Sequence, residues 1–117
     1  MATLNKVFLI GNLTSDPKLR KTEGRTPVAN FGLAVNQKYK VANSEQKENV
    51  CFIEIVAFSK LAEVCAEYLK KGKSVFIEGR LQYRRWEQEA KARSKIEVVA
   101  RTVQFLSKPE GSNKAFS

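Results

Sequence analysis

Residues 75–86 alternate between two kinds of side chain along their length. One set contains Val75, Ile77, Gly79, Leu81 and Tyr83. The other contains Phe76, Glu78, Arg80, Gln82, Arg84 and Trp86. Because successive side chains of a strand point to opposite faces, this pattern predicts a strand with one packed face and one solvent face. Two interpretations of the second face stay open at this point: its arginines and tryptophan bind phosphates and bases, or Trp86 caps the core of an ordinary amphipathic strand.

Four further segments have the composition of strands: residues 4–13, 28–39, 50–58 and 96–106. Between the third and fourth strands, the chain from Ser59 to Lys71 carries apolar side chains at helical spacing. Ser59 is the predicted N-cap of this helix and Gly72 its predicted C′ residue. This order of elements predicts an all-β fold with one helix, namely the five-stranded Greek-key barrel called the OB-fold, with the helix between strands 3 and 4.

The connections and ends carry weaker signals. Residues 14–27 contain Pro and Gly and predict a loop, and polar residues 41–49 predict a mobile connection. Residues 87–95 lack Gly and Pro, so we expect a longer, looser or partly helical connection there in place of a tight hairpin. We expect one OB-fold domain over residues 1–106 and a flexible C-terminal tail over residues 107–117.

The first strand has two features of its own. Four consecutive apolar residues, Val7 to Ile10, predict a strand that is covered on both faces, and one cover could be another subunit. Gly11 within the same run predicts a bulge or a sharp bend, which a closing barrel needs.

The net charge of +9, from 21 basic and 12 acidic residues, favours a polyanionic partner. Nucleic acid ranks first and an anionic membrane second, and solubility alone is the remaining explanation. The chain shows no signal-peptide apolar segment and no run near the ~20 apolar residues that span a bilayer. We therefore expect a soluble, intracellular protein.

The residues that most enzymes use are scarce. The chain has no His and two Cys, no Gly-rich phosphate loop, and no base that sequence can pair with a Ser or Thr. Glu87 and Glu89 are explained by a solvated connection. We expect no catalytic residues, no metal and no cofactor. Cys51 and Cys65 are predicted to be small buried hydrophobes in a reducing compartment.

Four aromatic residues, Tyr39, Phe52, Phe58 and Trp86, stand on predicted strands or at strand exits, with Lys and Arg in the loops around them. Unpaired bases can stack on such rings, whereas a duplex hides its base faces, so this combination favours a single strand. The periodicity leaves open that Phe52 and Phe58 belong to the core and that Tyr39 is merely exposed.

Several motifs resemble the bacterial-type single-stranded DNA-binding proteins. They are Asn5-Lys6-Val7, Gly11-Asn12-Leu13, Asp16-Pro17, Arg20, Phe58-Ser59-Lys60-Leu61-Ala62-Glu63-Val64, Tyr68-Leu69-Lys70-Lys71-Gly72, Val75-Phe76-Ile77-Glu78-Gly79-Arg80-Leu81 and Trp86. They occur in the family's order and cover about residues 4–106.

The resemblance implies an OB-fold homotetramer that covers transient single-stranded DNA during replication, recombination and repair, in the cytoplasm beside the nucleoid. The family's stacking positions fall on Tyr39, Phe52, Phe58 and Trp86. As phosphate contacts we select Lys6, Arg20, Lys60, Lys71, Arg84 and Arg85, with a role in the helix surface alone as the alternative for Lys60 and Lys71.

Two departures from the family pattern stand out. The connection 87–95 lacks the usual turn glycine. The end, Lys114-Ala115-Phe116-Ser117, lacks the acidic tip with which family members recruit replication and repair proteins. We expect either a truncated chain or a variant without that recruitment. The competing functions are an OB-fold docking factor of a replication-restart complex and an RNA-binding protein.

Overall fold

The computed structural model describes residues 1–40 and 46–106, without the side chains of Tyr39, Lys40 and Gln46. Its elements in chain order are β1 (Val7–Leu13), β2 (Lys18–Lys21), β3 (Pro27–Lys40), β4 (Gln46–Phe58), α1 (Ser59–Tyr68), β5 (Ser74–Gln88) and β6 (Lys91–Phe105). The predicted tail and most of the predicted mobile connection lie outside the described residues. The rest of that connection, residues 46–49, belongs to β4.

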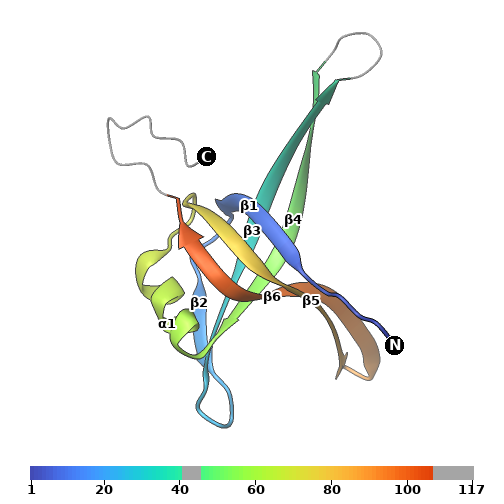
Figure 1. Cartoon of the computed structure of the whole chain (residues 1–117). Helices are drawn as coiled ribbons and strands as arrows, with labels where there is room; N and C mark the ends of the chain where they lie inside the picture. The colour runs from blue at the N-terminus through green and yellow to red at the C-terminus, as the bar shows by residue number, and fades with distance from the viewer. Residues whose placement is uncertain (41–45, 107–117) are drawn as a thin grey trace.

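Five strands close into a barrel (Figure 1). β1 pairs antiparallel with both β3 and β5, β3 pairs with β4, and β5 pairs with β6. The ring closes where β6 runs parallel to β4. β2 pairs only with the edge of β3 and stays outside the ring. The predicted OB-fold is therefore confirmed, and α1 lies between the third and fourth barrel strands when β2 is left out of the count.

The core fills the barrel with side chains of one parity from each strand. The largest buried ones include Phe31 and Leu33 of β3, Ile55 of β4 and Ile77 of β5. Full burial of each such side chain contributes roughly 1.5–3 kcal/mol. α1 packs against β3 and β4 and adds Ala62, Cys65 and the adjoining Leu69 to the same core. The apolar positions of the predicted helix are therefore covered by the barrel.

Glycines mark the places where strands approach most closely. A Cβ on Gly11 would clash with the carbonyl oxygen of Ala34, at the point where β1 turns from β5 toward β3. A Cβ on Gly79 would clash with the carbonyl oxygen of Val99 on β6. The β5–β6 register shifts between Glu78 and Gly79, which is a bulge. These contacts give β1 and β5 the curvature that closure requires.

Beyond this bulge, β5 and β6 leave the barrel as a two-stranded ribbon, here called the β5–β6 arm (residues 81–96), at the lower right of Figure 1. Leu81 and Tyr83 were predicted to share the packed face of Val75 and Ile77, and this was wrong. They are 48% and 62% exposed, because the arm has no second layer to cover them.

The arm also corrects the prediction for the connection 87–95. β5 continues to Gln88, β6 begins at Lys91, and only Glu89 and Ala90 form the turn. Both turn residues have positive φ, 54° and 64°, as a two-residue hairpin of the I′ type requires. The paired strands on either side stabilise this turn conformation without the usual Gly. The absence of a turn glycine was therefore not evidence for a loose connection.

Three local predictions also fail. The predicted loop 14–27 contains β2, whose residues Lys18 to Lys21 pair with β3. Ser59 is not the N-cap: it is the first helical residue, after Phe58, and no side chain caps this end. α1 ends at Tyr68, where the Leu69 N–H donates to the Cys65 carbonyl, so Gly72, with a φ of 92°, belongs to the following turn.

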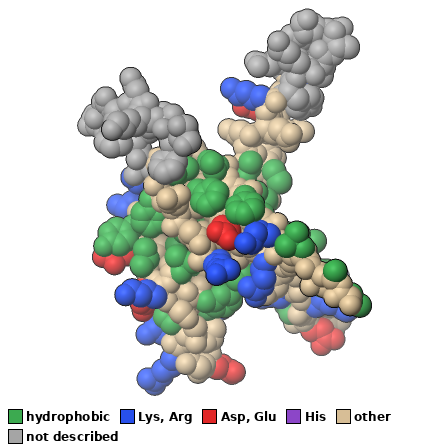
Figure 2. All heavy atoms as spheres, viewed as in Figure 1, with side chains coloured by type: hydrophobic (Ala, Val, Ile, Leu, Met, Phe, Trp, Pro, Cys, Tyr) green, Lys and Arg blue, Asp and Glu red, His purple; other side chains and the backbone are tan. Residues whose placement is uncertain are grey.

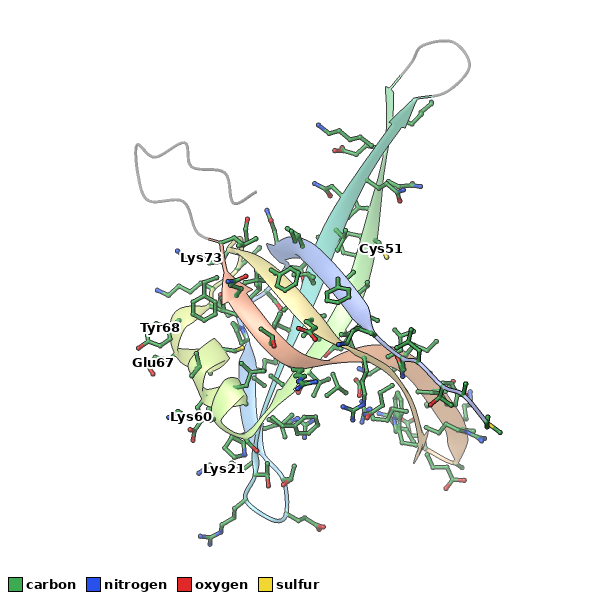
Figure 3. All side chains as sticks on the ribbon, viewed as in Figure 1. Lys21, Cys51, Lys60, Glu67, Tyr68 and Lys73 are labelled. Carbon is green, nitrogen blue, oxygen red and sulfur yellow. The ribbon has the colours of Figure 1, made fainter. Side chains whose placement is uncertain are left out.

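The two cysteines differ in environment. Cys65 is buried in α1, as predicted, and desolvation raises the pKa of its thiol from 9.0 to about 11. Cys51 was predicted to be buried but is exposed, because it lies on the part of β4 that runs out beyond the barrel (Figure 3). In the described part of the chain, no helix is long and apolar enough to cross a membrane.

Candidate nucleic-acid interface

The outer face of β4 presents two phenylalanines to solvent. Phe52 is 72% exposed and Phe58 is 39% exposed, while Ile55 and Ala57, of the opposite parity, are fully buried in the core. Strand alternation therefore resolves the open question about both phenylalanines in favour of the outward orientation. Glu54 lies between them on the same face and is half-buried.

Trp86 stands on the β5–β6 arm within a small charged network. The guanidinium carbon of Arg84 lies 4.7 Å from the centre of the Trp86 ring, in cation–π contact. The Nε atom of Arg84 lies 3.4 Å from Oε1 of Glu97, whose side chain is only 3% exposed. The Gln82 amide donates to the same oxygen over 3.4 Å, and Lys95 Nζ lies 3.9 Å from Oε2. Trp86 is half-buried against this network and lies outside the barrel core.

Basic side chains from three elements meet around a shallow groove of about 400 Å³. Its lining residues are Lys18, Arg20, Asn30, Glu54, Arg84 and Lys95. The Nε atom of Arg20 donates to Asn30 Oδ1 over 3.2 Å, and Asn30 Nδ2 donates to Glu54 Oε2 over 3.3 Å. We call this hollow the cationic groove. Four cations around one open groove make a site that attracts phosphate.

A second groove of about 390 Å³ adjoins the first, since Glu54 lines both. We call it the apolar groove, and its lining residues are Thr14, Gly32, Phe52, Ile53, Glu54 and Ile96. Ile96 is 61% exposed, because it lies at the root of the arm. Exposed Phe52 and Ile96 give this groove walls on which a flat, apolar base can pack.

The selected residues divide into two groups. Phe52, Arg20 and Arg84 line the two grooves, and Trp86 joins them through its contact with Arg84. Phe58 lies at the end of β4, where it pairs with Val28. Tyr39 pairs with Lys47 in the β3–β4 ladder, and its side chain lies outside the described part of the chain.

The other basic candidates lie elsewhere. Lys6 forms an ion pair with Glu78 at 3.1 Å, on the outer side of β1 and β5. Arg85 is exposed and has the opposite parity to Arg84, so it faces the other side of the arm. Lys60 is exposed on α1 (Figure 3). Lys71 is exposed after α1, and its backbone N–H donates to Asp16 Oδ1 over 2.8 Å.

The contact residues selected from the sequence did not include four residues of this surface: Lys18, Lys95, Ile96 and Glu97. The first three follow from β2 and the β5–β6 arm, neither of which was predicted. Glu97 did carry a signal, since it is one acidic residue within the apolar run from Ile96 to Ala100. Buried carboxylates usually have cationic partners, so this position pointed to a nearby Arg or Lys.

A separate apolar patch covers the outer face of β1 and β5. Phe8 and Ile10 are 60% and 58% exposed. The Phe8 and Phe76 rings stack with their centres 6.2 Å apart. Figure 2 shows apolar side chains gathered over these strands in the middle of the view. The predicted second cover of β1 is thus not supplied by the described part of this chain.

A closed five-stranded Greek-key barrel with one helix, an outward aromatic face and an adjoining cationic groove defines an OB-fold protein of the kind that binds single strands. The Single-strand binding protein family model matches residues 4–106, so the chain belongs to that family. The resemblance seen in the sequence motifs is therefore confirmed.

Named relatives agree with this assignment. The chain is 43% identical over 110 residues to single-stranded DNA-binding protein 2 of Chlorobaculum tepidum, covering 92% of this chain and 74% of that protein. It is 46% identical over 109 residues to the single-stranded DNA-binding protein of Caldanaerobacter subterraneus subsp. tengcongensis, covering 92% and 71%.

Solved structures share the fold. The Plasmodium falciparum SSB complex with ssDNA superposes with a TM-score of 0.82 at 27% identity, covering 92% of this chain and 98% of that one. The wild-type single-stranded DNA-binding protein of Thermus aquaticus gives 0.77 at 33% identity, covering 89% of this chain and 50% of that one. The chain thus spans about half the length of the Thermus aquaticus protein.

Proposed function

We propose that this chain binds single-stranded DNA irrespective of its sequence, without catalysis, and protects it during replication, recombination and repair. The observation that carries this proposal is the continuity of the two grooves: the exposed Phe52 ring and four cations adjoin around Glu54. Membership of the Single-strand binding protein family supports it. The same function implies a cytoplasmic, nucleoid-associated location, with residues 1–106 as the binding domain and residues 107–117 as a tail.

The two grooves divide the binding energy between them. Each base stacked on an aromatic ring contributes about 1–3 kcal/mol, whatever the base, because every base has a π face. Phe52 and Trp86 are the first candidates, with Phe58 and Tyr39 extending the path. Each phosphate neutralised on a single strand adds about −0.7 to the slope of log K against log salt. Four groove cations then predict a slope of about −3 for each chain in contact with DNA.

We further propose that the apolar patch of Phe8, Ile10 and Phe76 is the contact between chains of a homotetramer. Phe8 and Ile10 are exposed and Phe76 is half-buried on the same face of the sheet, and this is the kind of apolar surface that association buries. None of these three residues lines the cationic or the apolar groove, so association through the patch leaves both grooves free. The mass of the intact protein by light scattering tests this, and a monomeric mass would refute it.

The chain's single tryptophan provides the test of binding. Trp86 fluorescence is titrated with oligo-dT at two salt concentrations. The proposal predicts strong quenching and an affinity that falls as salt rises. A signal unchanged by oligo-dT would support a protein-docking factor of a replication-restart complex. If oligo-U competed with oligo-dT equally well at equal concentration, the surface would not discriminate against the 2′-hydroxyl. RNA would then bind as well as DNA.

A further inference from the structure

We propose that Glu54 biases this surface towards bases with an exocyclic amino group, so that cytosine is favoured over thymine at one position of the bound strand. This inference rests on the proposed single-strand binding and goes beyond it. The expected bias is modest, because it acts at one subsite within a surface that otherwise holds any sequence by stacking and phosphate contacts.

Glu54 is an acidic residue on a surface that is otherwise cationic, and its presence there needs an explanation. It lies in the middle of the exposed β4 face and lines both the cationic and the apolar groove. The remaining charged residues of these grooves are Lys18, Arg20, Arg84 and Lys95, all cations. A carboxylate among them repels phosphate and weakens the field that attracts it. If the surface served only phosphates, a neutral or basic residue would bind DNA better here.

Neighbouring side chains hold Glu54 in place. Asn30, on the paired strand β3, donates from Nδ2 to Glu54 Oε2 over 3.3 Å. Asn30 in turn accepts from Arg20 Nε over 3.2 Å, so three side chains form one chain of hydrogen bonds. A carboxylate offers about four lone-pair sites on two oxygens, and this bond occupies one of them. The group therefore has both a fixed position and remaining acceptor capacity.

Base chemistry determines which ligand fits. In a single strand the Watson–Crick edge of each base is free for protein contacts. Cytosine presents its N4 amino group, a donor that a carboxylate accepts well. Thymine has one donor on this edge, N3–H, and it lies between the acceptors O4 and O2, which face carboxylate oxygens unfavourably. A base held on Phe52 in the apolar groove would have its edge near Glu54, because both residues line that groove.

A plainer role for Glu54 is to position Arg20 through Asn30, or to reduce the local positive charge. Both would alter the affinity for all oligonucleotides together. A base bias would instead alter the ratio of affinities for two oligonucleotides with equal numbers of phosphates. The ratio for dC and dT therefore separates the two roles, since the phosphate contribution cancels.

The experiment compares wild type, Glu54→Gln and the control Glu67→Gln, each titrated with oligo-dC and oligo-dT of equal length at neutral pH and one salt concentration. Each substitution removes one negative charge, and Glu67 lies exposed on α1, away from both grooves (Figure 3). Binding is followed by Trp86 fluorescence and by a labelled-strand anisotropy that does not depend on Trp86.

We expect the dC-to-dT affinity ratio of wild type to fall by about fivefold or more in Glu54→Gln, since a charged acceptor is lost and the amide can donate to thymine O4. Glu67→Gln should keep the wild-type ratio. An unchanged ratio in Glu54→Gln, with both strands still bound, would overturn the inference and leave the proposed function intact. If wild type bound neither oligo-dC nor oligo-dT, the proposed function would be refuted.

Discussion

Replacing Phe52 with Ala separates a binding role from a structural one. The ring is 72% exposed, so roughly a quarter of it is buried within the chain. Since full burial of a Phe side chain is worth about 1.5–3 kcal/mol, the truncation removes less than about 1 kcal/mol of folding free energy by this route. For a domain of this size we expect the melting temperature to fall by less than about 8 °C.

The expected effect on binding is larger. Loss of one stacking platform costs about 1–3 kcal/mol, which is an affinity loss of about 5- to 150-fold for oligo-dT. The salt slope should stay near the wild-type value, because Phe52 carries no charge and contacts no phosphate in this account. Anisotropy of a labelled oligo-dT at several salt concentrations measures both quantities.

Tyr68→Ala is the matched control. Tyr68 is also an exposed aromatic, at 58%, but it lies on α1 beside Phe105, away from both grooves. The Tyr68→Ala variant should bind oligo-dT with wild-type affinity. If Phe52→Ala bound as tightly as Tyr68→Ala, or if it unfolded, the assignment of Phe52 to a stacking platform would be wrong.

Three further predictions test the framework of the site. Gly79→Ala should destabilise the fold by about 1–3 kcal/mol in urea unfolding, because its Cβ meets the β6 backbone; an unchanged midpoint would contradict the close approach. Glu97→Gln should destabilise by about 1–3 kcal/mol and shift Trp86 emission, because the charged partner of Arg84 is lost; unchanged emission would show that this pair does not set the ring's environment. In the native protein, Cys51 should react with a thiol reagent and Cys65 should not, so two fast thiols per chain would contradict the burial of Cys65.

The same burial gives a pH dependence. Desolvation raises the pKa of the Cys65 thiol from 9.0 to about 11, so the native state keeps a proton that the unfolded chain releases first. This contribution to stability is complete below pH 9 and is lost as the pH rises towards 11. Urea unfolding across this range measures it, and Cys65→Ala should remove this part of the decline.

Most of the barrel could be predicted from local sequence patterns. Phe31, Leu33 and Ile55 alternate with their neighbours in two of the predicted strands, and all three are buried in the core. The helical spacing of residues 59–71 located α1, although its ends differ. These predictions succeed because one covered face imposes its period directly on the sequence.

The failures have a common cause, which is the extension of strands beyond the barrel. Leu81, Tyr83 and Cys51 follow a core-like pattern but lie where no second layer covers them. The tight turn at Glu89 is held by the ladder of the arm and has no signal of its own in composition. Strand pairing in the folded protein thus determines whether these residues are buried or exposed. The register of that pairing cannot be read from a single sequence.

The candidate site was predicted in part for the same reason. The outward ring of Phe52 follows from strand parity, but the cationic groove assembles Lys18, Arg20, Arg84 and Lys95 from β2, β5 and β6. Charge counting indicates a polyanionic ligand without indicating which cations meet. Two of the six basic residues selected from sequence, Arg20 and Arg84, line this groove.

Binding by the proposed surface requires that bases, and not only phosphates, reach the exposed rings. Oligo-dT and an abasic strand of the same length carry the same phosphate charge, so their comparison isolates the bases. We predict that oligo-dT quenches Trp86 and binds at least about tenfold more tightly than the abasic strand. Equal affinities, with Trp86 emission unaffected by either strand, would contradict the account.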